Sequence, residues 1–150
     1  MTPPADPETA DPEALARACA ETMWAQDRAC QDLGVELVDV GPGHARLEMV
    51  VTDAMLNGHG MCHGGFIFTL ADSAFAYACN SHGERAVASA CSIAYLRPGK
   101  AGDRLVAVAQ ERARAKRSGL YDVRVSAPDG GVVAEFRGHS RVVGSFSPPA

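Results

Sequence analysis

The sequence lacks the features of several large classes of protein. Its five cysteines are odd in number and form no C-x-x-C pair, which argues against a disulfide framework and against a zinc knuckle. No apolar run reaches the length needed to cross a membrane, and the first residues have neither the basic start nor the apolar stretch of a signal peptide. We therefore expect a cytoplasmic protein that holds no metal and has no membrane partner.

The sequence also lacks an excess of positive charge. It has 14 basic and 18 acidic residues and a formal net charge of -4, so no global positive field attracts phosphate backbones, and nucleic acid is excluded as a partner. Its 150 residues, 47% of them hydrophobic, suffice for one core. We expect flexible tails at 1–11 and 144–150 around a single domain at 12–143.

Hydrophobic periodicity predicts an α+β domain. Asp11 can cap a helix that starts at Pro12 and ends near Leu33. Residues 65–80 are apolar on all sides, which is typical of a helix enclosed by the rest of the domain. The remaining apolar runs predict six strands, at 34–40, 44–52, 86–96, 103–115, 120–127 and 132–143. An antiparallel sheet of about six strands wrapped around the central helix satisfies this order.

Asp72 is the single charged residue between Gly64 and Gly83. It could be structural, either capping a neighbouring group or pairing with an arginine, but no basic residue lies within two helical turns of it. An unpaired buried carboxylate destabilises a fold by several kcal/mol, which favours a functional reason for keeping it.

The sequence Cys62-His63-Gly64-Gly65 opens the same helix. The first amides of a helix have no intrahelical partner, and glycines let a ligand approach them, so this start is either a plain glycine turn or an oxyanion hole. Gly64 lies eight residues before Asp72, about 12 Å along the axis. If both act on one substrate atom, the glycines must come from a second chain with an antiparallel helix, which predicts an isologous dimer.

Four motifs carry a resemblance to a known family: N-G-H-x-x-C-H-G-G at 57–65, L-A-D-S-A-F-A-Y-A-C-N-S at 70–81, A-S-A-C-S-I at 88–93 and L-R-P-G at 96–99. From about residue 14 to 143 the chain resembles the hotdog-fold acyl-CoA thioesterases of the phenylacetate-degradation (PaaI) branch. The resemblance implies a hotdog fold and hydrolysis of phenylacetyl-CoA or hydroxyphenylacetyl-CoA. It implies no cofactor, since coenzyme A is part of the substrate, and a homotetramer built from two dimers.

The resemblance also implies roles for individual residues. Asp72 is the nucleophile or the general base for water, and the Gly64 amide, with Gly65 beside it, is the oxyanion donor. Asn57 and His63 orient the thioester and the water. The coenzyme A nucleotide would be held by five residues, Arg97, Gly99, Lys116, Arg117 and Ser118.

The strand after the central helix departs from the family pattern. Some relatives supply a serine there to hold the water, where this chain has Ala88. Either Ser89 or Ser92 substitutes for that serine, or the contact is absent. Direct attack by Asp72 and activation of water by Asp72 both stay open.

Several alternatives stay open from sequence. A hotdog dehydratase or hydratase would use a histidine and an acid on a 3-hydroxyacyl or enoyl thioester, and a non-catalytic acyl-CoA-binding module would keep Asp72 for structure alone. Cys62 could be a nucleophile if a base lay beside it, or it could pack as a small apolar residue. The spacing of His59, Cys62 and His63 matches no standard zinc pattern.

Overall fold

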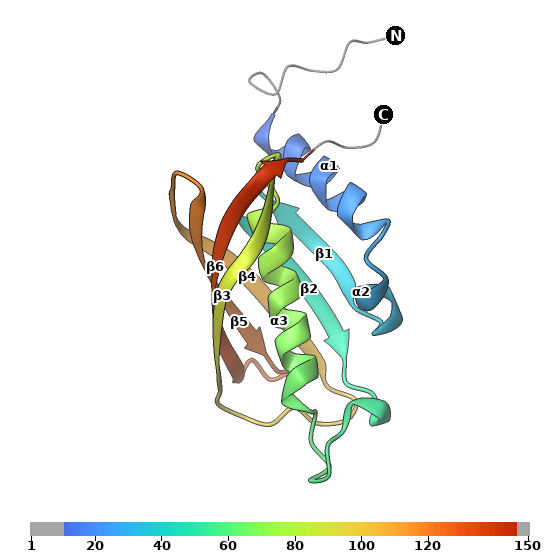
Figure 1. The fold of residues 1–150 in the computed structure, drawn as a ribbon. Helices are drawn as coiled ribbons and strands as arrows, with labels where there is room; N and C mark the ends of the chain where they lie inside the picture. The colour runs from blue at the N-terminus through green and yellow to red at the C-terminus, as the bar shows by residue number, and fades with distance from the viewer. Residues whose placement is uncertain (1–10, 147–150) are drawn as a thin grey trace.

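The structure, a computed structural model, describes residues 11–146 and has the predicted α+β architecture. The expected tails at 1–10 and 147–150 lie outside the described residues. Six antiparallel strands in the order β1-β2-β4-β5-β6-β3 form one curved sheet around α3 (Figure 1). The helices are α1 (Pro12–Trp24), α2 (Arg28–Asp32), the short 3-10 helix η1 (Asp53–Met55) and α3 (Gly64–Cys79). The strands are β1 (Glu36–Gly41), β2 (His44–Val50), β3 (Glu84–Tyr95), β4 (Arg104–Ala115), β5 (Ser118–Ser126) and β6 (Val132–Ser145).

The core lies between α3 and the concave face of the sheet. Strand alternation places every second residue of β2, β4 and β5 against the helix, and these side chains are fully buried: Ala45, Leu47, Met49, Leu105, Ala107, Ala109, Val123 and Val125. The ring of Phe75 rests on Gly138 of β6, where an added Cβ would lie 2.8 Å from the ring. The glycine therefore lets the sheet approach the helix closely.

The predicted helix from Pro12 to Leu33 is wrong in one respect, because it is two helices. Asp27 interrupts it: one carboxylate oxygen accepts from the Cys30 N–H at 3.1 Å and the other from the Tyr77 hydroxyl at 2.9 Å. Aspartate favours such capping positions over a helix interior. The break folds α2 back onto α3, where the Cys30 thiol donates to the Ser73 hydroxyl at 3.3 Å.

The last strand extends beyond its predicted range of 132–143, while the expected domain boundary at residue 143 stays a prediction. Strand β6 continues to Ser145, and the Phe146 N–H then donates to the Gly83 carbonyl at 3.0 Å. The end of β6 therefore lies against the turn that follows α3 (Figure 1).

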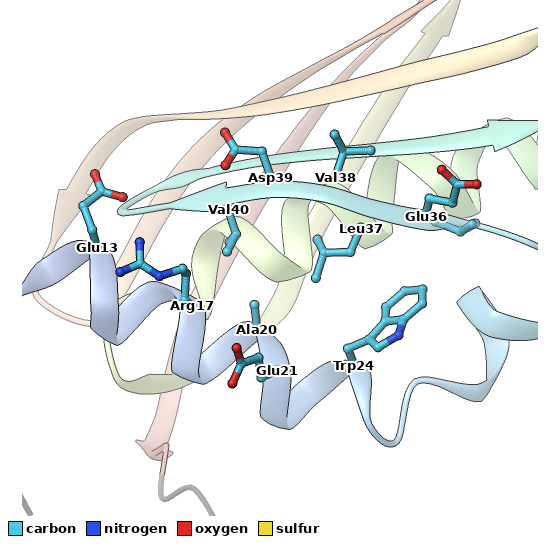
Figure 2. Close-up of a pocket in the computed structure, with 11 residues that line it drawn as sticks. Glu13, Arg17, Ala20, Glu21, Trp24, Glu36, Leu37, Val38, Asp39 and Val40 are labelled. Carbon is cyan, nitrogen blue, oxygen red and sulfur yellow. The ribbon is translucent and has the colours of Figure 1, made fainter.

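The two edges of the sheet differ. Helix α1 lies beside the edge strand β1, and a groove of about 640 Å³ separates them; Glu13, Arg17 and Trp24 line its helical side (Figure 2). At the other edge, β3 pairs with β6 and with no other strand of the described chain. Three large apolar residues are exposed at or just beyond this strand, namely Val87, Tyr95 and Leu96.

Asn80 fixes β3 to the end of α3. Its side-chain oxygen accepts from the Ala86 N–H at 2.9 Å, and its side-chain nitrogen donates to the Ala86 carbonyl at 3.1 Å. The amide thus mimics a paired strand at the start of β3. None of the described helices is both long and apolar enough to cross a membrane.

Candidate active site

Asp72 lies on the third turn of α3, on the side that faces β3. It is half-buried, and burial raises the pKa of its carboxyl above the usual value. Within residues 11–146, no hydrogen bond or ion pair to this carboxyl is present, although Arg85 lines the same cavity. The structural alternative, a carboxylate held by an arginine of the same chain, is therefore not what the fold provides.

The cavity at Asp72 has a volume of about 380 Å³ and is mostly apolar. It lies between α3 and the start of β3. Its other lining residues are Met23, Phe75, Ala76, Cys79, Asn80, Arg85, Ala86, Val87, Ala88 and Phe146.

His63 caps α3 and decides which amide at the helix start is available. Its backbone is extended, and its Nδ1 accepts from the Gly65 N–H at 2.9 Å, while its carbonyl accepts from the Phe66 N–H at 3.0 Å. In the described part of the chain, the Gly64 N–H has no acceptor. Of the two glycines, Gly64 therefore offers a free donor and Gly65 does not.

A second cavity of about 380 Å³ contains Gly64 and none of the residues around Asp72. Its lining residues are Met61, Cys62, Gly64, Ile67, Tyr95, Leu96, Arg97 and Pro98. Both cavities are lined in part by β3, at opposite ends of that strand. Within one chain, the carboxylate and the free amide are thus separated, as the axial distance of about 12 Å requires.

The polar residues before the helix shape its entry. The Asn57 side-chain oxygen accepts from the His59 N–H at 2.9 Å and from the Met61 N–H at 3.3 Å, which closes the loop 57–61. Cys62 is buried, and burial raises the pKa of its thiol, so the thiolate that a nucleophile needs is disfavoured. Groups of three or more metal-binding side chains are absent from residues 11–146.

Comparisons with known proteins show the family to which the chain belongs. Residues 59–134 match the family model described as "Thioesterase superfamily". The chain belongs to the thioesterase superfamily. It is 50% identical over 125 residues to the acyl-coenzyme A thioesterase PaaI of Escherichia coli, which covers 83% of this chain and 89% of that protein. The resemblance to the PaaI branch is thereby confirmed.

Solved structures confirm the hotdog fold. The structure of the E. coli PaaI protein matches with a TM-score of 0.88 and 47% identity, covering 90% of this chain and 98% of that one. A Streptococcus mutans protein bound to acetyl-CoA matches with a TM-score of 0.73 and 32% identity, covering 75% of this chain and 91% of that one.

The candidate serines of this thioesterase do not reach the Asp72 cavity. Ala88 lines it, whereas Ser89 lies at a β-bulge and its hydroxyl donates to the His139 carbonyl at 3.1 Å. Ser92 lines a different cavity, beside Asp122. Among residues 11–146, no serine lines the Asp72 cavity.

The residues predicted to hold the nucleotide form two separate groups. Arg97 and Gly99 lie near the start of α3, but both guanidinium NH₂ groups of Arg97 donate to the Asp129 carboxylate, at 2.9 and 2.7 Å. Gly99 is buried, and its carbonyl accepts from the Cys62 N–H at 2.9 Å.

The second group occupies the turn between β4 and β5, near the opposite end of α3. Lys116 adopts a φ of 56° there, and Arg117 follows it. Lys116 and Ser118 line a small cavity together with Cys79, the last residue of α3, and His82, which follows the helix. One chain therefore does not bring the two groups together.

Sequence reasoning missed three contributors to these cavities. Tyr95 lines the Gly64 cavity and donates to the Gly64 carbonyl at 2.9 Å, while Met23 and Phe146 line the Asp72 cavity. Each lies far along the chain from the glycine or carboxylate that it approaches. No local pattern marks them.

Proposed function

We propose that this chain is an acyl-CoA thioesterase that hydrolyses aryl acyl-CoA, such as phenylacetyl-CoA or hydroxyphenylacetyl-CoA, to the free acid and coenzyme A. The observation that carries the proposal is that the same helix has a carboxylate without an ion-pair partner, Asp72, and a free N–H at its start, Gly64. The first suits a nucleophile or general base, and the second suits an oxyanion donor. The similarity to the E. coli thioesterase supports coenzyme A thioesters as the substrate class.

The active site is completed by a second chain. The two cavities lie at opposite ends of β3, whose outer edge is unpaired within the described chain. Val87 and Tyr95 of this strand and Leu96 just after it are exposed. A two-fold axis across this edge would set two β3 strands antiparallel and place the Gly64 cavity of one chain over the Asp72 cavity of the other. The same operation brings Arg97 of one chain toward the Lys116 turn of its partner.

In this arrangement the thioester carbonyl oxygen accepts from the Gly64 N–H of one chain. In one route Asp72 of the other chain attacks the carbonyl carbon, the thiolate of coenzyme A leaves, and water then hydrolyses the mixed anhydride to release the free acid and restore Asp72. In the other route Asp72 removes a proton from a water that attacks the carbonyl carbon, and the thiolate leaves with formation of the free acid. Both routes need Asp72 ionised and need the negative charge on oxygen to be stabilised, and loss of one such donor lowers the rate by about 10² to 10³. The chemistry needs no metal or cofactor.

Two variants of Gly64 distinguish the effect of losing its N–H from the effect of adding a side chain. Gly64 is the first residue of α3, where proline is well tolerated, and extended His63 suits a following proline. Gly64→Pro removes the N–H and adds a Cβ, which would lie 3.0 Å from the Tyr95 ring. Gly64→Ala adds the same Cβ and keeps the N–H. We expect thiol release from phenylacetyl-CoA to fall about 10²-fold further in the proline variant than in the alanine variant.

Mixed chains test the shared site. Asp72→Asn and Gly64→Pro are each expected to be inactive alone. Refolding them together should restore about one quarter of the wild-type rate, because half of the random dimers contain one intact site out of two. Thiol release that persists in Asp72→Asn, or mixtures that recover nothing, would contradict the proposal. Light scattering of the same samples reports whether the dimers pair into the expected tetramer.

A further inference from the structure

The Asp72 cavity extends along α3 away from the site of chemistry. Asp72, Ala76 and Asn80 follow one another at four-residue spacing and share a face of the helix, and they span about 12 Å of its axis. The carboxylate lies at one end of this row, and Asn80 marks the other end. An acyl group whose carbonyl carbon lies at Asp72 therefore has one direction in which to extend, toward the C-terminal end of α3.

The inner part of the cavity offers little to a polar acyl group. The Asn80 side chain is already bonded to the Ala86 N–H and to the carbonyls of Ala76 and Ala86. The Cys79 thiol donates to the Ala76 carbonyl at 3.5 Å, and burial raises its pKa to about 12, so it stays neutral. Apart from Arg85, the groups left to contact a ligand there are the apolar surfaces of helix and strand.

Two residues that line the cavity come from outside α3 and β3. Met23 is on the last turn of α1, and Phe146 directly follows β6. The hydrogen bond from the Phe146 N–H to Gly83 holds that residue beside the end of α3, where the end of β6 and α1 converge (Figure 1). Methionine adapts to the shape of a neighbour, whereas a phenylalanine ring is rigid.

We infer that Met23 and Phe146 form the end wall of an acyl-binding chamber and set the longest acyl group that the enzyme accepts. This inference rests on the proposed function and adds a limit to it. The chamber, about 380 Å³, takes a phenyl ring and its methylene or a medium-length alkyl chain beside Asp72. An acyl group extended by further methylenes meets the side chains of Met23 and Phe146.

A series of arylalkanoyl-CoA thioesters tests the end wall: phenylacetyl, 3-phenylpropanoyl, 4-phenylbutanoyl and 6-phenylhexanoyl. The readout is kcat/KM for the longest member divided by that for phenylacetyl-CoA. A methylene in an apolar pocket changes kcat/KM about 10-fold or more, so Met23→Ala and Phe146→Ala should each raise this ratio at least about 10-fold. Phe146→Trp should lower it. Loss of folding cannot produce a gain on the longer substrates.

Val143→Ala is the matched control. Val143 is an exposed apolar residue of β6, three positions before Phe146, and it does not line the chamber. We expect its ratio to equal that of the wild type. A ratio unchanged in both Met23→Ala and Phe146→Ala, while hydrolysis still depends on Asp72, would overturn the end wall and leave the proposed function standing.

Non-hydrolysable thioether analogues of the same series give a readout that needs no turnover. Calorimetric affinities should show the same shift toward longer acyl groups in Met23→Ala and Phe146→Ala. If the wild type cleaves no thioester but shows this shift, the proposed function fails and the chamber stands. If the affinities do not shift, the end wall is overturned whatever the activity.

Discussion

The hydroxyl group of Tyr95 donates a hydrogen bond of 2.9 Å to the carbonyl oxygen of Gly64. It ties the last residue of β3 to the first residue of α3, 31 positions earlier in the chain. Gly64 also has the free N–H, so one residue holds both the bonded carbonyl and the proposed oxyanion donor. The bond therefore holds the proposed oxyanion donor in place relative to the edge strand.

Tyr95→Phe is predicted to lower kcat for phenylacetyl-CoA about 5-fold, because a hydrogen bond of this kind contributes about 1 kcal/mol. Tyr121→Phe is the control. Tyr121 also loses one hydrogen bond, to Glu111 at 2.8 Å, but it lines neither of the two cavities at β3. Steady-state kinetics should show a fall in the first variant alone, and equal kcat values in both would contradict the positioning role.

The pH dependence of hydrolysis should report Asp72. Burial raises the pKa of this carboxyl above its ordinary value of 3.8, and catalysis requires the ionised form. We predict that kcat/KM rises with pH through an inflection that lies above 3.8. The measurement is the rate of thiol release as a function of pH, from about pH 3.5 upward. An inflection at or below 3.8 would contradict the assignment to Asp72.

Asp72→Asn should be at least as stable as the wild type at pH 7. A raised pKa means that the folded protein binds the Asp72 proton more tightly than the unfolded chain does, so ionisation destabilises the fold. This penalty is absent below the unfolded pKa and complete above the folded one. Thermal unfolding should therefore show an advantage for the variant at neutral pH that shrinks toward pH 3.8; a lower melting temperature at pH 7 would reveal a stabilising partner.

Asn80→Ala is predicted to destabilise the fold by about 2 to 3 kcal/mol, because it leaves the N–H and carbonyl of Ala86 buried without this partner. The melting temperature should fall by roughly 5 to 10 °C. Gln110→Ala, at an exposed amide on β4, is the control and should change it little. Calorimetry measures the melting temperatures of both variants. Equal values would show that the hydrogen bonds between Asn80 and Ala86 contribute little to stability.

The ion pair between Arg97 and Asp129 allows a test of the nucleotide contact. If Arg97 binds a phosphate of coenzyme A, it must leave Asp129, whose pKa it lowers to about 2. We predict that Asp129→Asn lowers KM for phenylacetyl-CoA and that Arg97→Ala raises it, while kcat changes little in either. The same order should appear in the inhibition constants of free coenzyme A. Identical KM values in both variants would remove Arg97 from the predicted set.

The sequence by itself determined the elements and the two chemical groups. The run 65–80 has apolar residues on all sides of a helix, which predicted an enclosed helix, and the alternation that buries Ala45, Leu47 and Met49 specified a strand with one face on the core. The solitary carboxylate of Asp72 and the glycines at 64–65 were visible because each departs from its local surroundings. The expected dimer, the nucleotide contacts and the roles of Asn57 and His63 stay predictions.

The folded structure decided which of these groups are free to act. Gly64 and Gly65 look alike in sequence, yet the imidazole of His63 occupies one amide and leaves the other free. Asp27 broke a helix that periodicity had made continuous, because its carboxylate found Tyr77, fifty residues away. Met23 and Phe146 meet at one cavity for the same physical reason: hydrogen bonds and packing between distant segments form only when the chain is folded, and no local pattern records them.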